Sequence, residues 1–346
     1  MIDDRPPRIP HPTDAIMPRA GVYQSSPTLQ RKSRCVLPHG TADAVRQGGY
    51  GGTLQVMLRR VIGWLALALG GLVLATHLLV TDFVSMRYGA PVDLTFEPGE
   101  RFVRSEAALF GKRADYAIQA CCAGSTFTTV GLDGDAGTAR GFRIRPTDSR
   151  VKGNFRSELR MRPTPVGWTV WYRSNIYVPA DWQDSATPVI AMQWHGSKDF
   201  FLFEPGKYPP LELDIAGRNW VVHKSWDTRI VSTPTAFGNT EGISTIGTAP
   251  LVKGHWQRWT FRVHWSVSGK GSVVAWLGNA MIVNDRGPNA HRDLIGPYLK
   301  AGVYVPRWGH HGGDPGISER VLDFDDIQVR FGDNPFGMAL PAGARD

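Results

Sequence analysis

The sequence predicts an antiparallel β-sandwich that follows one membrane-spanning helix. Among 346 residues there are 12 Trp, 39 Gly and 25 Pro, and they accompany many short β-rich runs, as in sandwiches and barrels. From about Pro91 these runs alternate with turns and show little helical periodicity. One stretch, residues 61–80, has 20 positions without a formal charge, which is the length that spans a bilayer.

The N-terminal segment, residues 1–56, is rich in Pro, Gly, Arg and Ser without apolar periodicity, and we expect it to be disordered. It also carries most of the net charge of +8, because residues 1–60 hold 9 basic and 4 acidic side chains, whereas residues 90–346 hold 29 and 26. Any preference of the remaining chain for anions must therefore come from a local patch. No aromatic and basic motif indicates a nucleic-acid partner.

Residues 57–82 are predicted to form a transmembrane signal anchor whose core, residues 61–80, lies in the membrane. Arg59 and Arg60 precede this core and Asp82 follows it, so the positive-inside rule places the N-terminus in the cytoplasm and the rest in an extracytoplasmic, periplasmic position. The alternative start at Met57 would make the segment a secretory signal, and the protein would be secreted if it were cleaved. No small-x-small cleavage site follows closely, which favours the uncleaved anchor.

Residues 91–332 are predicted to form the β-domain, and the Gly-, Pro- and Ala-rich residues 333–346 a flexible tail. The β-domain contains ten candidate strands bounded by turn residues. They are residues 141–145, 155–162, 168–178, 188–195, 211–215, 220–224, 256–265, 272–283, 299–305 and 321–331.

Three of these strands divide into an apolar and a polar face, because alternate residues of a strand point to opposite sides. In residues 188–195, Ile190, Met192 and Trp194 are expected in the core, and Gln193 and His195 on the other side. The polar sides of the other two strands carry Arg156, Glu158 and Arg160, and Tyr298, Lys300, Gly302 and Tyr304. A surface of this kind is cationic and rich in donors, which suits a polymer that bears carboxylates.

Each of these features has a simpler explanation. An Arg/Glu alternation is most often a solvated sheet face, His195 alone would be structural, and Lys300 alone would protect a sheet edge from aggregation. The same division in three strands favours a binding site. Gly302 would then leave room for the close approach of a ligand.

Six segments resemble, in order and spacing, the polysaccharide lyases of the heparin lyase type I and glucuronan lyase group. They are NFRSELRMR, GWTVWYRSNIYVPADW, VIAMQWHG, HWQRWTFRVHWS, VVAWLGNAMIV and YLKAGVYVPRW. The resemblance implies a concanavalin-like jelly roll whose concave face binds an anionic glycan. It also implies that His195 and Tyr304 act in β-elimination, with Gln193 and Lys300 as neighbours in the site.

The chemistry of β-elimination asks for these residue types. Loss of the C5 proton beside a uronate carboxylate leaves an enolate-like dianion, which Arg156, Arg160, Gln193 and Lys300 would neutralise. Neutral His195 suits the base, and Tyr304 the acid, or both acid and base, with a nearby cation favouring its phenolate. Glu158 and Tyr298 complete the predicted substrate-binding set.

Metal ligands and cysteine chemistry are weaker signals in this sequence. The resemblance includes members with a calcium ion, for which Asp323, Asp325 and Asp326 offer hard oxygen ligands, although no more than two of them share a strand face. No cofactor is certain on these grounds. Cys121 and Cys122 are expected to be ordinary thiols, since an adjacent pair closes only a strained ring.

Two rival functions remain open. A membrane-tethered lectin without catalysis would use the same surface for an anionic glycan. A laminarinase-type glycoside hydrolase would use Glu212 and Asp214, which share a strand face, but the position of its second carboxyl falls on Gly217 or Ala216, and neither ionises. The particular uronate, the linkage, endo or exo action and the oligomeric state do not follow from the sequence.

Overall fold

A computed structural model of the chain describes residues 51–88, 91–97, 102–103, 114, 116–132, 134–199, 202–236, 238–311 and 313–342. Within these residues it contains sixteen strands and two helices, which confirms the all-β prediction. The predicted disordered segment lies outside the described residues up to residue 50.

Helix α1, Gly51–Tyr88, contains the predicted membrane segment. Its part Gln55–Thr76 has 22 residues and is long and apolar enough to cross a membrane, and none of it is buried within the protein. The large apolar side chains of this part, such as Leu65, Leu67 and Leu69, are exposed.

Two eight-stranded sheets make up the β-domain. The first sheet contains β14 (Ala280–Arg286), β13 (Ser272–Leu277), β12 (Trp256–His264), β7 (Thr169–Tyr177), β16 (Arg320–Phe331), β5 (Gly134–Ile144) and β4 (Thr126–Gly131) in this order, with β1 (Val92–Leu94) also on β16. The second contains β11 (Gly242–Pro250), β10 (Asn219–Trp226), β9 (Leu211–Ala216), β8 (Val189–Ser197), β15 (Ile295–Val305), β6 (Phe155–Pro163), β3 (Tyr116–Gln119) and β2 (Phe102–Val103). A short helix, α3 (Trp308–His311), follows β15.

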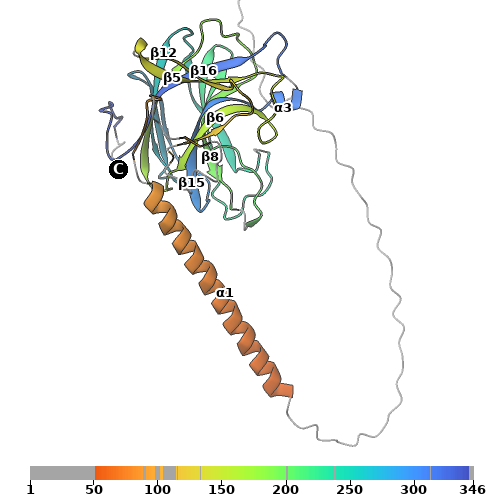
Figure 1. The fold of residues 1–346 in the computed structure, drawn as a ribbon. Helices are drawn as coiled ribbons and strands as arrows, with labels where there is room; N and C mark the ends of the chain where they lie inside the picture. Colours follow the sequence, from red (N-terminus) through yellow and green to blue (C-terminus); the bar gives the residue numbers. More distant parts are fainter. Residues whose placement is uncertain are drawn as a thin grey trace, which may run out of the picture. The chain divides into compact units, whose positions relative to one another are not determined.

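The two sheets pack face to face as a jelly-roll sandwich, and Figure 1 shows β6, β8 and β15 in one layer and β5, β12 and β16 in the other. Neighbouring strands are antiparallel except β2 and β3. The core between the layers is aromatic, and Trp194, Trp220 and Trp259 are fully buried in it. Burial of such large rings is the main favourable term for a sandwich of this kind.

All ten predicted strands are present, with one difference in connectivity. The predicted strand 272–283 is a hairpin of β13 and β14, which turns at Gly278, where φ is 58°. A glycine accepts this left-handed conformation without the steric cost of a side chain. Strands β1 to β4 and β11 were not predicted, since β1 to β3 are very short and β11 lacks alternation.

The segment after β16 is described as far as residue 342. Phe336, Met338 and Leu340 pack against Trp171 and Trp276, whose rings are stacked with centroids 5.8 Å apart. This small cluster is separate from the main core of the sandwich.

Candidate active site

The predicted site residues lie together on one side of the second sheet, which we call the polar face: it is the side opposite the core. In the ladders Lys300 lies opposite Arg160 and Gln193, Tyr298 opposite His195, and Tyr304 opposite Arg156. Residues that face one another in a ladder point to the same side of the sheet. The polar face therefore carries all eight predicted residues on one side of the sheet: Arg156, Glu158, Arg160, Gln193, His195, Tyr298, Lys300 and Tyr304.

The alternation predicted for β15 is exact, because Leu299, Ala301, Val303 and Val305 are all buried in the core. In β8 one position differs. A bulge between Ile190 and Met192 resets the alternation, so Ile190 lies opposite Tyr304 on the polar face and outside the core cluster. The prediction of a core position for Ile190 was wrong because a bulge adds a residue that sequence periodicity does not reveal.

Gly302 serves the backbone more than the ligand. Its φ is 146°, and an added Cβ would lie 2.2 Å from the carbonyl oxygen of Ser157 on β6. A side chain there would collide with the neighbouring strand. The close approach of the β6 backbone thus explains the glycine at this position, without the space for a ligand between Lys300 and Tyr304 that was predicted.

Glu158 is the centre of the polar network. Its Oε2 accepts hydrogen bonds from Lys300 Nζ at 3.2 Å and from Arg156 at 3.4 Å, and its Oε1 accepts one from Gln193 Nε2. All four side chains are buried, and Glu158 is 2 % exposed. Because its oxygens are occupied by these donors, Glu158 orients the cations of the site.

His195 has one defined tautomer. Its Nδ1 lies 2.8 Å from the carbonyl oxygen of Gly196, and since a carbonyl only accepts, Nδ1 carries the hydrogen and Nε2 keeps its lone pair. Burial, together with the ammonium of Lys300, lowers the pKa of His195 to about 4. The imidazole is therefore neutral at pH 7 and can accept a proton at Nε2.

Tyr304 remains protonated in the unliganded protein. The guanidinium of Arg156 lies 4.0 Å from its ring centroid, and Asn154 Nδ2 donates to its hydroxyl at 3.2 Å. Burial raises the pKa of Tyr304 above its ordinary value and outweighs the opposite effect of Arg156. The guanidinium of Arg156 does favour the phenolate, as expected, but burial has the larger effect, because a buried anion loses more solvation than the guanidinium returns.

Two further acidic residues face the same side from β9. Glu212 lies opposite Gln193, and Asp214 lies opposite Ile190. Burial raises the pKa of Asp214 to about 8, and burial together with Asp214 raises the pKa of Glu212 well above its usual range. Sequence reasoning had placed these carboxyls in a hydrolase motif and had not connected them with the site of Lys300.

Asn154 and Gln119 also belong to the site and were missed. Asn154 precedes β6, and its contact with Tyr304 spans 150 positions of sequence, which no local pattern predicts. Gln119 is on the unpredicted strand β3, opposite Glu158. The sequence offers one indication only: Asn154 is the first residue of the segment NFRSELRMR, which carries other site residues.

The predicted calcium ligands do not converge. Asp325 accepts hydrogen bonds from the backbone amides of Leu132 and Asp326 at 2.8 Å each, and Asp326 accepts one from Asn175 at 3.0 Å. Among the described residues these aspartates are not one of the groups whose ligand atoms lie close enough for one ion. Within the described structure Asp323, Asp325 and Asp326 therefore do not form a carboxylate cluster by themselves.

A closer carboxylate group consists of Asp199, Glu204 and Asp293, whose oxygens lie within 4.8 Å of one another. Lys207 fills it: its ammonium lies 2.9 Å from Glu204 and also contacts Asp293, and these side chains are at most 3 % exposed. A calcium ion does not fit beside this ammonium, because both would need the same oxygens. We call this arrangement the lysine cage.

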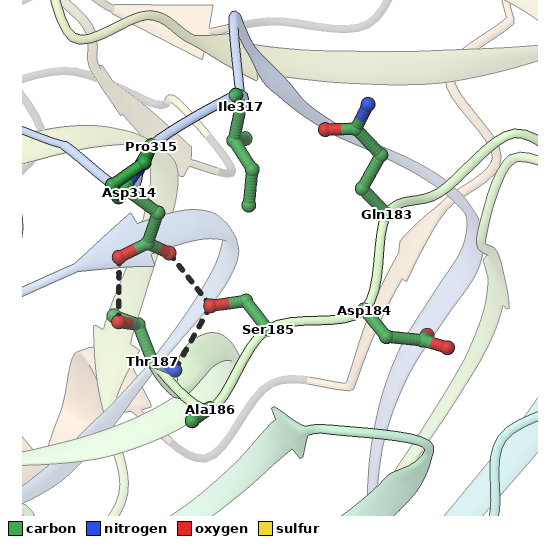
Figure 2. A pocket seen from close by; sticks show the side chains of 9 residues that line it. Gln183, Asp184, Ser185, Ala186, Thr187, Asp314, Pro315 and Ile317 are labelled. Carbon is green, nitrogen blue, oxygen red and sulfur yellow. Dashed lines mark hydrogen bonds between the residues drawn. The ribbon is translucent and has the colours of Figure 1, made fainter.

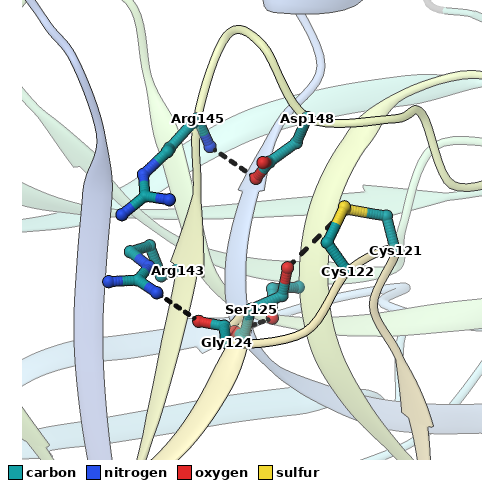
Figure 3. Close-up of a disulfide and its surroundings, with 8 residues drawn as sticks. Cys121, Cys122, Gly124, Ser125, Arg143, Arg145 and Asp148 are labelled. Atoms are coloured by element: carbon teal, nitrogen blue, oxygen red, sulfur yellow. Dashed lines mark hydrogen bonds between the residues drawn. A yellow bond between two sulfur atoms is a disulfide. The ribbon is translucent and has the colours of Figure 1, made fainter.

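Cys121 and Cys122 are joined by a disulfide, as Figure 3 shows, so the prediction of two free thiols was wrong. The turn of residues 121–125 accommodates the bond, and Ser125 lies 3.6 Å from the sulfur of Cys121. Asp148 is close to both sulfurs, but disulfide sulfurs are not thiolates and do not serve as metal ligands.

A cavity of about 510 Å³ lies elsewhere on the β-domain and contains none of the predicted site residues. Figure 2 shows that Asp314 accepts hydrogen bonds from the hydroxyls of Ser185 and Thr187, each at 2.7 Å. The carboxylate thus fastens the loop after β15 to the segment before β8. These contacts account for the polar groups at this end of the cavity.

A jelly-roll sandwich with a buried cluster of cations, a neutral histidine and a protonated tyrosine on one sheet defines a candidate glycan-processing protein. Comparison with protein families identifies it more closely. The family model described as polysaccharide lyase matches residues 111–328, and the chain belongs to this family.

Comparison with solved structures gives two further matches. An endo-β-1,4-glucuronan lyase from the fungus Trichoderma reesei has a TM-score of 0.51 and 16% identity, and the match covers 64% of this chain and 96% of that one. An alginate lyase from Klebsiella pneumoniae has a TM-score of 0.40 and 16% identity, with 60% and 84% covered. No curated protein matches the chain significantly.

Proposed function

We propose that this polysaccharide lyase cleaves a uronic-acid-containing glycan by β-elimination on the polar face. The observation that carries the proposal is the presence, on one face of the sheet, of a base and an acid in suitable protonation states. His195 is neutral with a free Nε2, Tyr304 retains its proton, and both lie on the face that holds Arg156 and Lys300.

In the proposed reaction the uronate carboxylate is bound by Arg156, Arg160 and Lys300, which stabilise the charge that develops when C5 loses its proton. His195 Nε2 takes this proton. The electron pair of the C5–H bond forms the C4–C5 double bond, the C4–O bond breaks, and Tyr304 donates its proton to the leaving oxygen. The products are an unsaturated uronate end and a new hydroxyl-bearing end, so that atoms and charges balance.

Helix α1 would hold this activity at a membrane. The proposal is supported by the 22-residue apolar part of α1 and by Arg59 and Arg60 in its first half. We infer that the β-domain acts outside the cytoplasm. Residues 1–56, 57–82, 91–332 and 333–346 are proposed as N-terminal segment, anchor, lyase domain and tail.

The test uses the full chain in detergent with a panel of polyuronates, and follows the ultraviolet absorbance of unsaturated ends. We expect Tyr304→Phe and His195→Ala each to lower kcat by about 10²-fold or more, since each removes a proton-transfer group. Tyr177→Phe, on the other sheet, is the matched control and should retain activity. Full activity in either site variant contradicts the assignment.

The products distinguish the rival functions. Reducing ends without a double bond would indicate hydrolysis by Glu212 and Asp214. Tight binding of polyuronate without any cleavage after long incubation would indicate a lectin.

A further inference from the structure

The segment that joins β3 to β4 carries the disulfide of Cys121 and Cys122 and crosses from the second sheet to the first. A bond between neighbouring cysteines closes a small ring through a single peptide bond, which restricts the backbone torsions of both residues. Cys122 is exposed and Cys121 is half-buried, so a dissolved thiol can reach the bond. Exposed disulfides are the ones that thiols reduce readily.

Ser125 connects the disulfide ring to strand β6. Its Oγ lies 3.6 Å from Cys121 Sγ (Figure 3), and its backbone amide donates to the carbonyl oxygen of Cys122 at 3.1 Å. The carbonyl oxygen of Ser125 accepts a hydrogen bond of 2.6 Å from the hydroxyl of Ser157. Ser157 is fully buried in β6 and is the residue before Glu158. The turn that holds the ring therefore contacts the strand that carries Glu158.

The other end of the same segment also contacts β6. Gln119 is the last residue of β3, lies opposite Glu158 in the ladder, and is separated from Cys121 by one residue. The disulfide ring therefore lies between two contacts to consecutive residues of β6, one at Ser157 and one at Glu158. Glu158 is also the acceptor that orients the cations of the polar face. The conformation of this short segment thus bears directly on the site.

Contacts from the first sheet hold the turn independently of the ring. Arg143 on β5 donates from Nη2 to the carbonyl oxygen of Gly124 at 2.8 Å (Figure 3), and its backbone amide donates to the carbonyl oxygen of Ser125 at 2.8 Å. These bonds do not involve sulfur, so they can persist when the disulfide is broken. Opening of the ring should therefore loosen the segment and leave the β-domain folded.

We propose that Cys121 and Cys122 form a site of reversible thiol–disulfide modification that controls the polar face through β6. A dithiol donates two electrons and two protons, the Sγ–Sγ bond breaks, each cysteine becomes a thiol, and the donor becomes a disulfide. The backbone between Gln119 and Ser125 is then released, and Glu158 loses part of its fixed geometry. This inference rests on the proposed function and makes the lyase most active when oxidised. Disulfides persist outside the cytoplasm, where we infer that the β-domain acts.

The experiment measures the activity of the full chain in detergent before and after reduction with dithiothreitol. Alkylation followed by peptide mapping reports Cys121 and Cys122 separately from Cys35. We expect reduction to lower kcat about tenfold, because a small displacement of site residues slows the reaction, and reoxidation to restore it. The double variant Cys121→Ser/Cys122→Ser should have the low activity of the reduced protein and no response to dithiothreitol. Cys35→Ser is the matched control and should respond as the wild type does.

Ser157→Ala tests the route through β6, because it removes the hydroxyl that joins this strand to the turn and leaves the ring intact. The ratio of oxidised to reduced activity should fall from about tenfold to about twofold, since two changes along one connection are not additive. Ser174→Ala, at a buried serine of the first sheet, is the control and should keep the wild-type ratio. Equal activity with the bond intact and reduced overturns the proposal, and so does an unchanged ratio in Ser157→Ala.

A failure of the proposed function gives a different result. If no protein yields unsaturated ends from any polyuronate, the lyase assignment fails, and the modification site is then judged from amide hydrogen exchange. Reduction should raise the exchange rates in β3 by about tenfold or more and leave those in β13, on the other sheet, unchanged. Equal exchange in β3 before and after reduction excludes the coupling.

Discussion

The imidazole of His195 stacks on the phenol ring of Tyr298, with ring centroids 5.4 Å apart and planes 23° apart. The guanidinium of Arg160 also contacts this ring and lies 3.9 Å from its centroid. One aromatic side chain thus fixes the position of the proposed base and of one proposed carboxylate-binding cation. Stacking of this kind contributes about 0.5–1.5 kcal/mol for each contact.

We therefore predict that Tyr298→Ala lowers kcat/KM about tenfold, because His195 and Arg160 both lose their support. Tyr298→Phe keeps the ring and should stay within about twofold of the wild type. The measurement is the rate of formation of unsaturated ends. Equal losses in the two variants would show that the phenol hydroxyl, and not the ring, is what matters.

The pH dependence should be bell-shaped. His195 accepts a proton only when neutral, so activity should rise through its pKa of about 4. Burial lowers the pKa of Lys300 to about 8, and since an amine is charged below its pKa, activity should fall as the pH rises through that value. Lys300→Arg should extend activity to higher pH, because a guanidinium stays charged. If the alkaline limb of the pH–activity profile is the same in Lys300→Arg and the wild type, deprotonation of Lys300 is not its cause.

Glu158→Gln should shift the alkaline limb of the pH–activity profile in the direction opposite to Lys300→Arg. The carboxylate of Glu158 raises the pKa of Lys300 and partly offsets the effect of burial. Its removal should therefore move the alkaline limb to lower pH and weaken activity at pH 8 more than at pH 6. A uniform loss at all pH values would indicate that Glu158 acts only on the shape of the site.

Sequence alternation predicted the polar face because alternate residues of β6 and β15 carry the site side chains. The pairing of β15 nevertheless shifts register between Tyr298 and Lys300 against β6, and between Ala301 and Tyr304 against β8. The positions of Arg156, Glu158, Lys300 and Tyr304 follow from a period of two, and the ladder register then aligns them. The sequence pattern does not show that the three polar strands are neighbours in the sheet, because strand order depends on tertiary structure.

The remainder of the site depends on features that periodicity does not contain. The bulge at Ile190 changes a face, the φ of Gly302 gives that residue a steric role, and Asn154 reaches Tyr304 through tertiary structure. The direction in which the pKa of Tyr304 shifts depends on how deeply its hydroxyl is buried. The sequence shows a nearby cation but does not show this loss of solvent.

Asp214 should make stability depend on pH. Its folded pKa of about 8 lies above the value of an unfolded aspartate, so its stabilising contribution is complete below about pH 4 and decreases as the pH rises towards 8. We predict that Asp214→Asn increases the free energy of unfolding at pH 8 by on the order of 2 kcal/mol, with little change at pH 4. Denaturant titrations at both pH values measure this. A variant that is less stable at pH 8 would contradict the burial of an unpaired carboxyl.

In the lysine cage the ammonium group of Lys207 occupies the position that a bound metal cation would take among the carboxylates. Lys207 lies between Glu204 and Asp293, while the amide of Leu294 donates to Asp199 at 3.2 Å and the amide of Ser232 donates to Glu204 at 2.9 Å. The cage thereby ties the loop after β8 to the segment before β15. An added Cβ at Gly196, next to His195, would lie 2.9 Å from His291 Nδ1 and 3.1 Å from Asp293, so the cage lies close to the backbone of the proposed base.

We predict that Lys207→Ala destabilises the protein by about 3 kcal/mol or more, because it leaves buried carboxylates without their partner. Three carboxylates within reach of one another supply the hard oxygens that calcium binds, so calcium should restore part of the melting temperature of this variant and part of its activity. A chelator should leave the wild type unchanged at this site and destabilise the calcium-loaded variant. Lys207→Arg keeps the charge and should show no calcium response. If calcium raises the melting temperature of wild type and Lys207→Ala equally, the ion binds elsewhere and the ammonium does not act as its substitute.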